Sequence, residues 1–439
     1  MEFKKKIGII LKSKSIQNSG WIIGQQCFQM LMQLIVGVLT ARYLGPSNYG
    51  TLNYTASFVA FFTSIASLGM DGVVVKKIVD HPENEGLYLG SALMMRAISS
   101  SLSTIAVSLV VFVLNPTEPI KLVLVFLQSF RLGFKSIQIL DSWFQRYLCS
   151  KYVSIAKIIA CVGVAIYKIF LLATSKSIVW FALSNVLTDL LISIVEFIFY
   201  QKKKNQPLSF RFSVGKEILS ESYHFIVSGI MVAIYGQMDK IMIGQTMTDL
   251  DVGLYTTAAS ICGLWIFVPT AIINSFRPLV METKKTGNEE EYLLRLKQVY
   301  SFVIWLCLVA STAIAIVAKP LVELLYGDQY LGAVQTLRIL IWSEIFSMIG
   351  SARGIWILCE KKNKYVKYYL LFGTITNLIL NTIMIPVFGI DGAAIATLVT
   401  QIMTSVIAPL FYKETRVHTK LVMDAFLFRW YRKSRGGKK

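Results

Sequence analysis

Charged side chains occur inside stretches of the chain that are otherwise long and apolar. Ten of them are basic: Arg96, Lys121, Arg131, Lys135, Lys157, Lys168, Lys240, Arg277, Arg338 and Arg353. Four acidic residues lie as deep: Asp189, Glu196, Asp239 and Glu344. A charge at the centre of a bilayer costs at least about 2.5–3.5 kcal/mol, so such residues normally face a wet cavity or a partner. The excess of bases predicts a cationic interior, which would bind an anion.

The spacing of these residues predicts shared polar faces. Arg131 and Lys135 recur at three- and four-residue steps with Gln128, Gln138 and Ser142, which places them on one face of a helix. Lys157 and Lys168, eleven residues apart, also align. We predict that Arg131 and Lys135 line the cavity. The other predicted substrate-binding residues are Arg96, Arg277, Lys240, Arg353, Gln33 and Gln128.

Each assignment has a structural alternative. Lys121, Lys157 and Arg338 stand near predicted helix ends, from where long basic side chains reach the headgroups. Gln33 belongs to an uncharged polar stripe that equally suits contacts between helices. Arg131 has the alternative of pairing with an acid such as Asp189 or Glu196.

The four acids are candidates for ion coupling or charge pairing. Asp239 and Lys240 are adjacent and point about 100° apart on a helix, so they do not simply pair with each other. Asp239 is expected to hold an arginine elsewhere or to bind a coupling cation. Asp189 and Glu196 share a face of one segment, and Glu344 completes the set.

The elements that position these residues are predicted to be membrane-spanning helices. The chain has 439 residues, of which 55% are hydrophobic and 16% charged, against about 25% charged in soluble domains. Twelve segments have the roughly 20 apolar residues that a span needs. They lie near 20–41, 51–75, 88–114, 119–140, 152–174, 177–200, 222–246, 253–280, 298–318, 331–358, 365–388 and 391–412. The predicted fold class is therefore an all-α polytopic membrane protein.

Basic residues outside these segments fall almost entirely on one side. The N-terminal lysines, the loop at 201–216 and the C-terminal tail share that side, whereas Arg42, Lys176 and Lys319 are on the other. Because lysine and arginine favour the cytoplasmic side, both termini are predicted to be cytoplasmic. This asymmetry accounts for most of the net charge of +19, so nucleic acid is rejected as a partner.

The chain is predicted to form two lobes of six helices each, residues 1–205 and 206–439. An even number of spans per lobe makes any repeat parallel. Weak self-similarity agrees, since GTLNYTAS from Gly50 to Ser57 is similar to GLYTTAAS from Gly253 to Ser260. Parallel repeats with a binding site between them are a transporter architecture.

Several motifs together resemble one family. ARYLGPSNYG (Ala41–Gly50), QMDKIMIG (Gln237–Gly244), VGLY (Val252–Tyr255), YGDQY (Tyr326–Tyr330) and GIDGAA (Gly389–Ala394) resemble the polysaccharide transporter family, the Wzx-type flippases of O-antigen and capsule repeat units. That family belongs to the multidrug/oligosaccharidyl-lipid/polysaccharide exporter superfamily. The family is similar to the murein lipid flippases, which usually have fourteen helices, and the predicted twelve favour the polysaccharide branch.

The resemblance implies a V-shaped, MATE-like fold that alternates between inward- and outward-open states. It implies as cargo an oligosaccharide on undecaprenyl pyrophosphate, with the anionic headgroup in the cationic cavity and the lipid tail in the bilayer. The implied location is a bacterial cytoplasmic (inner) membrane, with a polysaccharide polymerase complex as a further possible partner.

Other classes of function fit less well. Six scattered cysteines and three separated histidines predict neither a disulfide framework nor a metal site. No GxxxxGK[ST] loop occurs, so no ATPase is predicted, and no cofactor and no catalytic residues are expected. Two alternatives remain open. One is a membrane glycosyltransferase or polymerase, which would want a large outer loop, and the other is a cation-coupled drug exporter, whose organic-cation cargo suits an acidic cavity.

Overall fold

The structure is a computed structural model that describes residues 14–429, and all regular elements within that range are helices. The lysines before residue 14 and the tail beyond Arg429, which contributed to the predicted topology, lie outside the described residues. The chain divides into two compact units, unit 1 with residues 1–237 and unit 2 with residues 238–439.

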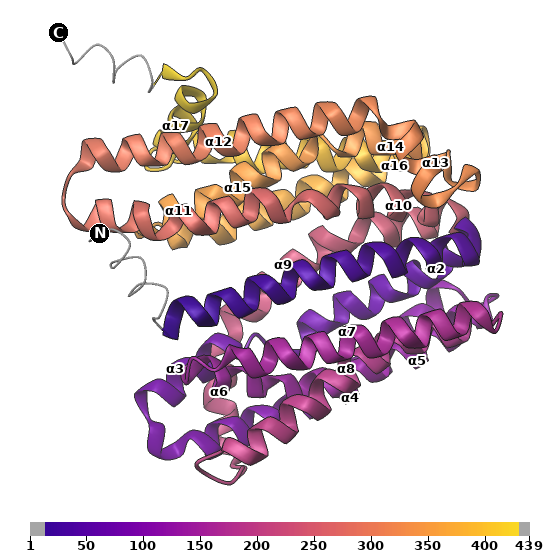
Figure 1. Cartoon of the computed structure of the whole chain (residues 1–439), viewed down its shortest axis with the longest axis horizontal. Coiled ribbons are helices and arrows are strands. Elements are labelled where there is room, and N and C mark those ends of the chain that lie inside the picture. Colours follow the sequence, from indigo (N-terminus) through magenta and orange to yellow (C-terminus); the bar gives the residue numbers. More distant parts are fainter. Residues whose placement is uncertain (1–13, 430–439) are drawn as a thin grey trace, which may run out of the picture. The chain divides into compact units, whose positions relative to one another are not determined.

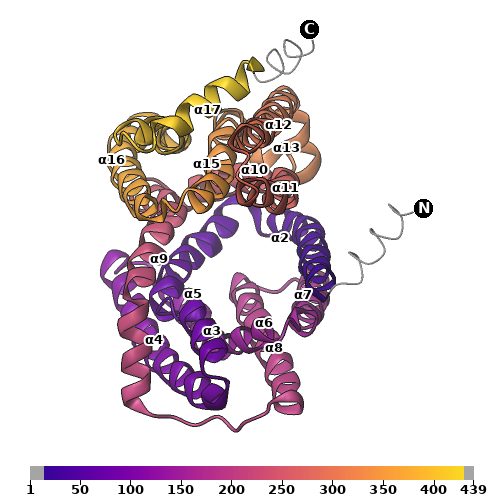
Figure 2. The same cartoon turned by 90° about the vertical axis from the view of Figure 1, so that its left-hand side faces the viewer.

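Unit 1 consists of long helices joined by short turns. They are α2 (Lys14–Ala66), α3 (Asp71–Asp80), α4 (Glu85–Leu114), α5 (Pro119–Ile137), α6 (Asp141–Arg146), α7 (Ser150–Ala173) and α8 (Ile178–Lys203), with the 3₁₀ turns η1 (Pro82–Asn84) and η2 (Gln138–Leu140). The next helix, α9 (Phe212–Thr246), begins in unit 1 and ends in unit 2. Viewed end-on, α4, α5, α8, α7 and α2 follow one another around unit 1 (Figure 2).

Unit 2 is built in the same manner (Figure 1). Its α-helices are α10 (Asp249–Trp265), α11 (Phe267–Lys285), α12 (Glu289–Ile316), α13 (Ala318–Tyr326), α14 (Ala333–Leu340), α15 (Ser343–Cys359), α16 (Val366–Ile402) and α17 (Arg416–Phe426). The 3₁₀ turns η3 (Asp328–Tyr330), η4 (Asn363–Tyr365) and η6 (Ala408–Leu410) and the π-turn η5 (Met403–Ile407) connect them. Aromatic and aliphatic side chains of α11, α12, α15 and α17 form its main apolar core.

Two glycines break helices without ending them. Gly45 in α2 has φ 72° and precedes Pro46, and Gly389 in α16 has φ 61° and follows Pro386 by three residues. Glycine accepts a positive φ with little strain, and a proline is well suited to open the helix that follows. The chain therefore bends at Gly45 and Gly389 and continues as helix at once.

Nine helical stretches within residues 14–429 are long and apolar enough to cross a membrane, whereas the sequence predicted twelve spans. Gly20–Asp80 has 61 residues and Asn363–Leu410 has 48, because helix continues across the bends at Gly45 and Gly389, each of which joins two predicted spans. The predicted span 331–358 is not one helix, since the chain turns between α14 and α15. The chain is thus an all-α, multi-pass membrane protein.

The connection between α8 and α9 is fastened to unit 1. Gly86 N donates to Gln206 Oε1 at 3.2 Å, Ser209 N donates to the Gly86 carbonyl at 3.1 Å, and Arg211 N donates to Ser91 Oγ at 3.1 Å. The two compact units divide inside α9, at 237/238, and the predicted division into six-helix lobes at 205/206 stays a prediction.

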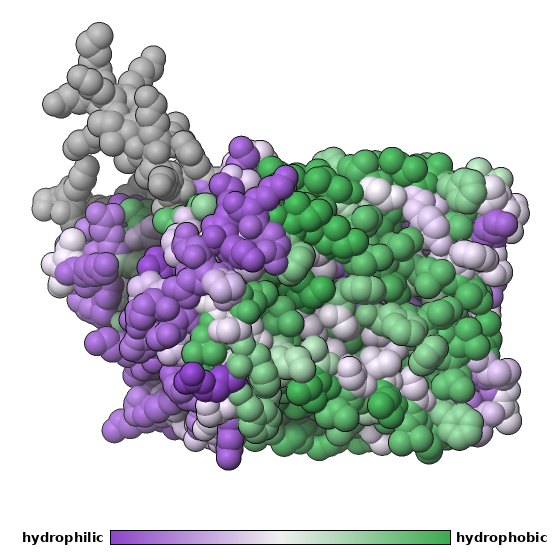
Figure 3. All heavy atoms as spheres, turned by 90° about the horizontal axis from the view of Figure 1, so that it is seen from below, coloured by the Kyte–Doolittle hydropathy of each residue, from purple (hydrophilic) through white to green (hydrophobic). Residues whose placement is uncertain are grey.

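The surface matches a membrane setting. Hydrophobic side chains cover most of the face seen in Figure 3, and hydrophilic ones gather at one end of it. Exposed large apolar residues recur along the helices, for example Leu102, Ile105 and Leu109 on α4. In water such a surface would be unfavourable, but lipid solvates it.

Candidate functional site

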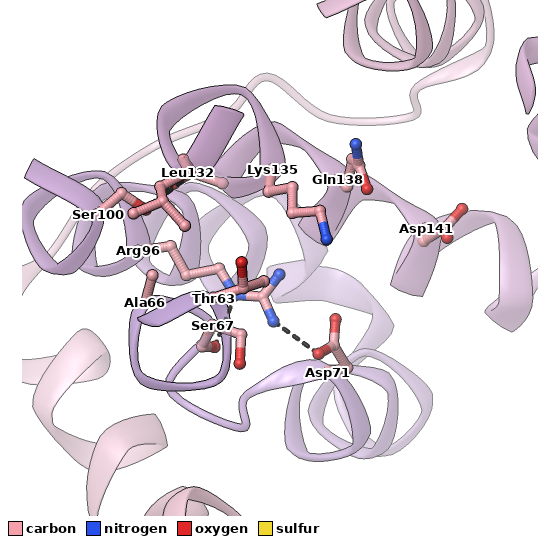
Figure 4. Close-up of a pocket in the computed structure, with 11 residues that line it drawn as sticks. Thr63, Ala66, Ser67, Asp71, Arg96, Ser100, Leu132, Lys135, Gln138 and Asp141 are labelled. Atoms are coloured by element: carbon pink, nitrogen blue, oxygen red, sulfur yellow. Dashed lines mark hydrogen bonds and ion pairs between the residues drawn. The ribbon is translucent and has the colours of Figure 1, made fainter. Parts of the chain in front are cut away.

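A polar pocket of about 200 Å³ lies inside unit 1 (Figure 4). It is lined by Thr63, Ala66, Ser67, Asp71, Arg96, Ser100, Leu132, Lys135, Ser136, Gln138 and Asp141. These residues come from α2, α3, α4, α5, η2 and α6. Of the predicted substrate-binding residues, this pocket brings together Lys135 and Arg96.

Arg96 is held in place by the chain around it. Its side chain is only 4% exposed, and its Nη2 lies 2.6 Å from Asp71 Oδ2. Its Nε donates to the Ser67 carbonyl at 2.9 Å. The guanidinium thereby ties α4 to the turn between α2 and α3, so much of its charge is already balanced.

Lys135 is different, because its ammonium group has no counter-ion. It extends from the last turn of α5 into the pocket (Figure 4). Among residues 14–429, none forms a hydrogen bond or an ion pair with it. A half-buried ammonium group without a partner among these residues raises the local electrostatic potential. Asp71 and Asp141 in the lining balance Arg96 and Lys135 in number, so it is Lys135, and not the pocket as a whole, that offers a contact to an anionic guest.

Arg131, one helical turn before Lys135, forms an ion pair. Its Nε donates to Asp189 Oδ2 at 2.7 Å, and Gln138 Nε2 donates to Asp189 Oδ1 at 3.2 Å. Asp189 is 5% exposed and Arg131 20%. This is the pairing that the sequence left as the alternative for Arg131, and it links α5 to α8.

A second group of charges connects α6, α7 and α8. Lys157 Nζ lies 3.7 Å from Asp141 Oδ2. Glu196 is fully buried, and neither of its carboxyl oxygens has a hydrogen-bond partner in the described part of the chain. Asp141, Lys157 and Asp189 are the charges close enough to act on it.

Asp71 and Asp141 line the pocket but are not among the acids predicted from the sequence. Both stand near the edges of predicted spans, where acids are usually solvated, and Asp71 is indeed more than half exposed. The structure continues α5 through η2 into α6, which keeps Asp141 beside α7, and Asp71 opens α3 directly after the turn that ends α2. Lys135, Gln138 and Asp141 follow one another at three-residue steps, and this spacing could have predicted that Asp141 lies on the same helix face as Lys135. Unit 1 is therefore less cationic than predicted.

Unit 2 holds a buried carboxylate of another kind. Asp239 is 9% exposed. Its Oδ2 accepts hydrogen bonds from Tyr255 at 2.6 Å and Thr397 at 2.7 Å, and its Oδ1 accepts them from Asn381 at 2.6 Å and Asn377 at 3.3 Å. All four donors are neutral, so the arginine partner expected as one alternative is absent from these contacts. We name these five residues the Asp239 cluster.

Both parts of α16 contribute to the Asp239 cluster. Asn377 and Asn381 lie one turn apart before the bend at Gly389, and Thr397 lies after it. The bend allows the second part of α16 to present Thr397 to the same carboxylate. Asp239 itself comes from α9 and Tyr255 from α10.

The other predicted residues of unit 2 do not gather at one place. Arg353 is 8% exposed, donates to the Thr404 carbonyl at 2.7 Å and lies 4.3 Å from the ring centroid of Tyr369. Arg277 is exposed on α11, and Lys240 and Glu344 are half-buried. Among the described residues neither Lys240 nor Glu344 forms a hydrogen bond or an ion pair.

The remaining predicted residues have local roles. Gln128 is buried and donates to Thr55 Oγ1 at 2.9 Å, and Gln33 is exposed on α2. Lys121 does not reach out to headgroups as expected, because it is 3% exposed, lies 2.9 Å from Glu118 and covers the ring of Tyr54. Lys121 lies in the first turn of α5 and Glu118 directly precedes that helix, so the two side chains reach each other.

Known proteins provide an independent view. A family model described as polysaccharide biosynthesis protein matches residues 15–278. The probable low-salt glycan biosynthesis flippase Agl15 of Haloferax volcanii is 24% identical over 370 residues, which are 81% of this chain and 75% of that protein. The lipid II flippase MurJ of Bacillus subtilis is 21% identical over 228 residues, which are 46% of this chain and 42% of that protein.

Solved structures share the fold. Lipid II flippase MurJ in an inward closed conformation matches with a TM-score of 0.73 and 15% identity over 93% of this chain and 91% of that one. An inward-facing multidrug resistance MATE family transporter matches with a TM-score of 0.68 and 12% identity over 90% of this chain and 96% of that one. Since the family model covers more than half of the sequence, the chain belongs to the polysaccharide biosynthesis protein family, with the fold of the MATE and MurJ transporters, and is a transporter and not an enzyme.

Proposed function

We propose that the chain is a flippase that moves an oligosaccharide linked to undecaprenyl pyrophosphate from the cytoplasmic to the outer leaflet of a bacterial cytoplasmic membrane. Family membership and the flippase names of the relatives support a lipid-linked glycan as cargo. The charge of Lys135 supports an anionic headgroup.

The observation that carries this proposal is the unpaired ammonium group of Lys135 in the pocket of unit 1. A diphosphate that leaves water must exchange its hydration for fixed positive charge and hydrogen-bond donors. A pocket of about 200 Å³ has room for a phosphate or diphosphate but not for an oligosaccharide. The sugars would therefore remain outside it while Lys135 holds the charged end.

For the transport cycle we infer alternating access between two six-helix lobes, residues 1–205 and 206–439, with twelve spans and both termini in the cytoplasm. The one-sided distribution of lysine and arginine supports this orientation. In the predicted topology of twelve spans, the bends at Gly45 and Gly389 fall at turns on the outer side of the membrane, one in each lobe. The remaining predicted cavity residues, Arg277, Lys240 and Arg353, stay candidates for later steps of the path.

Asp239 is our candidate for the coupling-ion site. The four donors around Asp239 are neutral, so none of them supplies a positive charge to a carboxylate there, and a proton or a small monovalent cation could do so. Asn381 Oδ1 has no hydrogen-bond partner among the described residues, and this oxygen is available as a further ligand.

Export of surface polysaccharide in a strain that lacks the native gene tests the function. Lys135→Glu should abolish export, Lys135→Gln should lower it at least about tenfold, and Lys135→Arg should retain part of it. Lys76→Gln, an exposed lysine on α3, is the matched control and should export normally. Protein amount in the membrane is measured for each variant. Normal export by Lys135→Glu would overturn the assignment.

One alternative, a cation-coupled drug exporter, predicts another result in the same strain. Its cargo would be an organic cation, which the unpaired Lys135 repels, so Lys135→Glu would raise resistance to cationic dyes and leave polysaccharide export unchanged. A polysaccharide polymerase as partner stays a prediction, and copurification from the polysaccharide-producing strain would test it.

A further inference from the structure

Helix α7 has two contrasting faces. Its exposed apolar side chains are Ile159, Val162, Ile166, Ile169 and Phe170. At 100° per residue these cluster on one side of the helix, and Lys157 and Lys168 lie on the opposite side with buried Val164. Lys168 is therefore turned away from the apolar surface, and headgroup contact along that surface does not explain it.

Lys168 has no counter-ion. Lys157, about 16 Å nearer the start of α7, is within 3.7 Å of Asp141. Lys168 is half-buried and forms no hydrogen bond or ion pair with any residue from 14 to 429. Cys161, two turns earlier on the same face, is the titratable side chain that acts on it electrostatically. An uncompensated ammonium group at membrane depth is costly to keep and is in itself a sign of function.

The acids of the neighbouring helix do not reach it. Tyr167 Oη donates to the Trp180 carbonyl at 3.1 Å, which fixes the register between α7 and antiparallel α8. In this register Asp189 falls opposite residue 158, about 15 Å along the axis from Lys168. Asp189 is moreover occupied by Arg131, and Glu196 is farther still along α8.

Helix α2 brings an uncharged donor to the same level. Asn18 pairs with Ser150 at 2.7 and 3.0 Å near one end of α2 and α7, and Tyr43 Oη donates to the Lys176 carbonyl at 3.2 Å near the other. The sequence offsets, 132 and 133 residues, agree, so the helices run parallel in register. Gln33 lies within one turn of the level of Lys168, on the face of α2 opposite the exposed Leu31 and Ile35.

We propose that Lys168, with Gln33 at its level, forms a second anion site in unit 1, nearer the predicted outer end of the membrane than Lys135. Its ligand is a phosphate or diphosphate group on a lipid, and it receives the headgroup after the Lys135 pocket. This inference rests on the proposed function and extends it. A single ammonium group with an amide binds weakly, which suits a relay site because the ligand must also leave.

Thiol labelling at this position tests the site without any transport assay. In a full-length chain with its six native cysteines replaced by alanine, Lys168→Cys is compared with Ile166→Cys on the exposed apolar face. We expect an anionic, membrane-impermeant methanethiosulfonate to label position 168 and not 166. Because Lys168→Cys lacks the ammonium group, protection is measured at Gln33→Cys with Lys168 kept, since Gln33 is exposed on α2. Geranylgeranyl diphosphate should slow labelling at 33 about tenfold, geranylgeraniol should not, and the protection should be lost when Lys168→Gln is added. An unreactive position 168, or labelling at 33 that the diphosphate leaves unchanged, overturns the site.

Export tests its role. Lys168→Gln should lower polysaccharide export about tenfold at normal protein amount, and Lys168→Arg should retain most of it. Treatment of Lys168→Cys with an aminoethyl methanethiosulfonate restores an ammonium group and should restore export, whereas an uncharged methyl reagent should not. Normal export by Lys168→Gln contradicts the relay. The variants Lys168→Gln and Lys168→Arg keep the native cysteines. Their export therefore tests the role of Lys168 even if the chain with six alanine substitutions folds poorly.

The two proposals can fail separately. If diphosphate protects position 33 in the presence of Lys168 but no Lys135 variant changes export, the site stands and the flippase assignment falls. If Lys135 variants abolish export but position 168 is not labelled and position 33 is not protected, the flippase assignment stands and the second site falls.

Discussion

The buried charges of unit 1 lie in neighbouring pairs of both signs, whereas unit 2 surrounds one carboxylate with neutral donors. In unit 1 Arg131 meets Asp189, Arg96 meets Asp71 and Lys157 approaches Asp141. In unit 2 Asp239 accepts four hydrogen bonds from uncharged side chains, and no arginine or lysine contacts it among the described residues. Unpaired charges of the other sign occur too among the residues that the structure describes, Glu196 in unit 1 and Lys240 in unit 2, so the contrast concerns these clusters and not the whole units.

The difference indicates a division of labour. Pairing consumes most of the positive charge in unit 1 and leaves Lys135 and Lys168 for a negatively charged ligand. The Asp239 cluster leaves one negative charge for a cation. Arg353 of unit 2 donates to a carbonyl oxygen and contacts the face of Tyr369, although its Nε has no hydrogen-bond partner among the described residues. Burial of a charge therefore does not by itself locate a ligand site.

The largest expected effect is at Asp239. Asp239→Asn keeps the size of the side chain and removes its charge, so it should lower polysaccharide export about 100-fold if the cluster binds a coupling cation. Glu323→Gln, an exposed acid on α13, is the control. Export assays at varied sodium concentration and pH check this. Normal export by Asp239→Asn would contradict the proposed coupling-cation site in unit 2.

Arg131 and Asp189 come next. Arg131→Ala leaves a buried carboxylate without its partner and should reduce the free energy of unfolding by about 3–5 kcal/mol. Arg131→Met combined with Asp189→Leu should regain most of it, since replacing a whole buried pair by apolar groups is often close to neutral. Thermal unfolding of the purified protein in detergent, together with export, measures both. A double variant as unstable as the single one would mean that Arg131 has another structural partner.

His418 on α17 gives stability a pH dependence. It is fully buried between Tyr300 and Trp356, and neither ring nitrogen has a hydrogen-bond partner among the described residues. Burial, with the charge of Arg353, holds the pKa of His418 well below its ordinary value of 6.5. Below pH 6.5, His418 therefore binds a proton in the unfolded chain but not in the folded chain.

Stability should accordingly be full above pH 6.5 and fall by up to about 1.4 kcal/mol per pH unit below it. Thermal unfolding in detergent at pH 7.5, 6.0 and 5.0 checks this, and His418→Phe should flatten the dependence. An unchanged slope in His418→Phe would assign the acid sensitivity to other groups.

The smallest effect is expected at Glu196. Its carboxyl oxygens have no hydrogen-bond partner among the described residues, so Glu196→Gln should leave the free energy of unfolding within about 1 kcal/mol and export unchanged. If Glu196→Gln instead abolished export at normal protein amount, unit 1 would contain an ion-coupling carboxyl group, and the contrast with unit 2 would no longer hold.

The sequence predicts the membrane class and many helices, because apolar length is a strong signal. The gaps between predicted spans, at 42–50 and 389–390, also fall at the bends, although the sequence does not show that helix resumes at once on the other side. The turn between α14 and α15 has no proline or glycine at Ile341–Trp342 to announce it. That break follows from tertiary packing, which hydropathy does not contain.

The candidate sites were predictable only in part. Lys135 and Arg131 stand out as bases within an apolar segment, but their contacts differ because Asp189 forms an ion pair with Arg131 and not with Lys135. That depends on the register between α5 and α8. In the Asp239 cluster, Asn377, Asn381 and Thr397 are neutral and carry no charge signal, so only the fold reveals that they share one carboxylate.

The most direct measurement of the central claim is transbilayer movement by the purified protein in liposomes. A glycan-labelled undecaprenyl diphosphate oligosaccharide is supplied on one side, and its appearance on the other is followed with an impermeant quencher. The account predicts time-dependent transfer by the wild-type chain and by Lys76→Gln, no transfer by Lys135→Glu, and little transfer of the same glycan on an uncharged polyprenyl carrier. Equal transfer by Lys135→Glu, or of the charged and uncharged substrates, would contradict it.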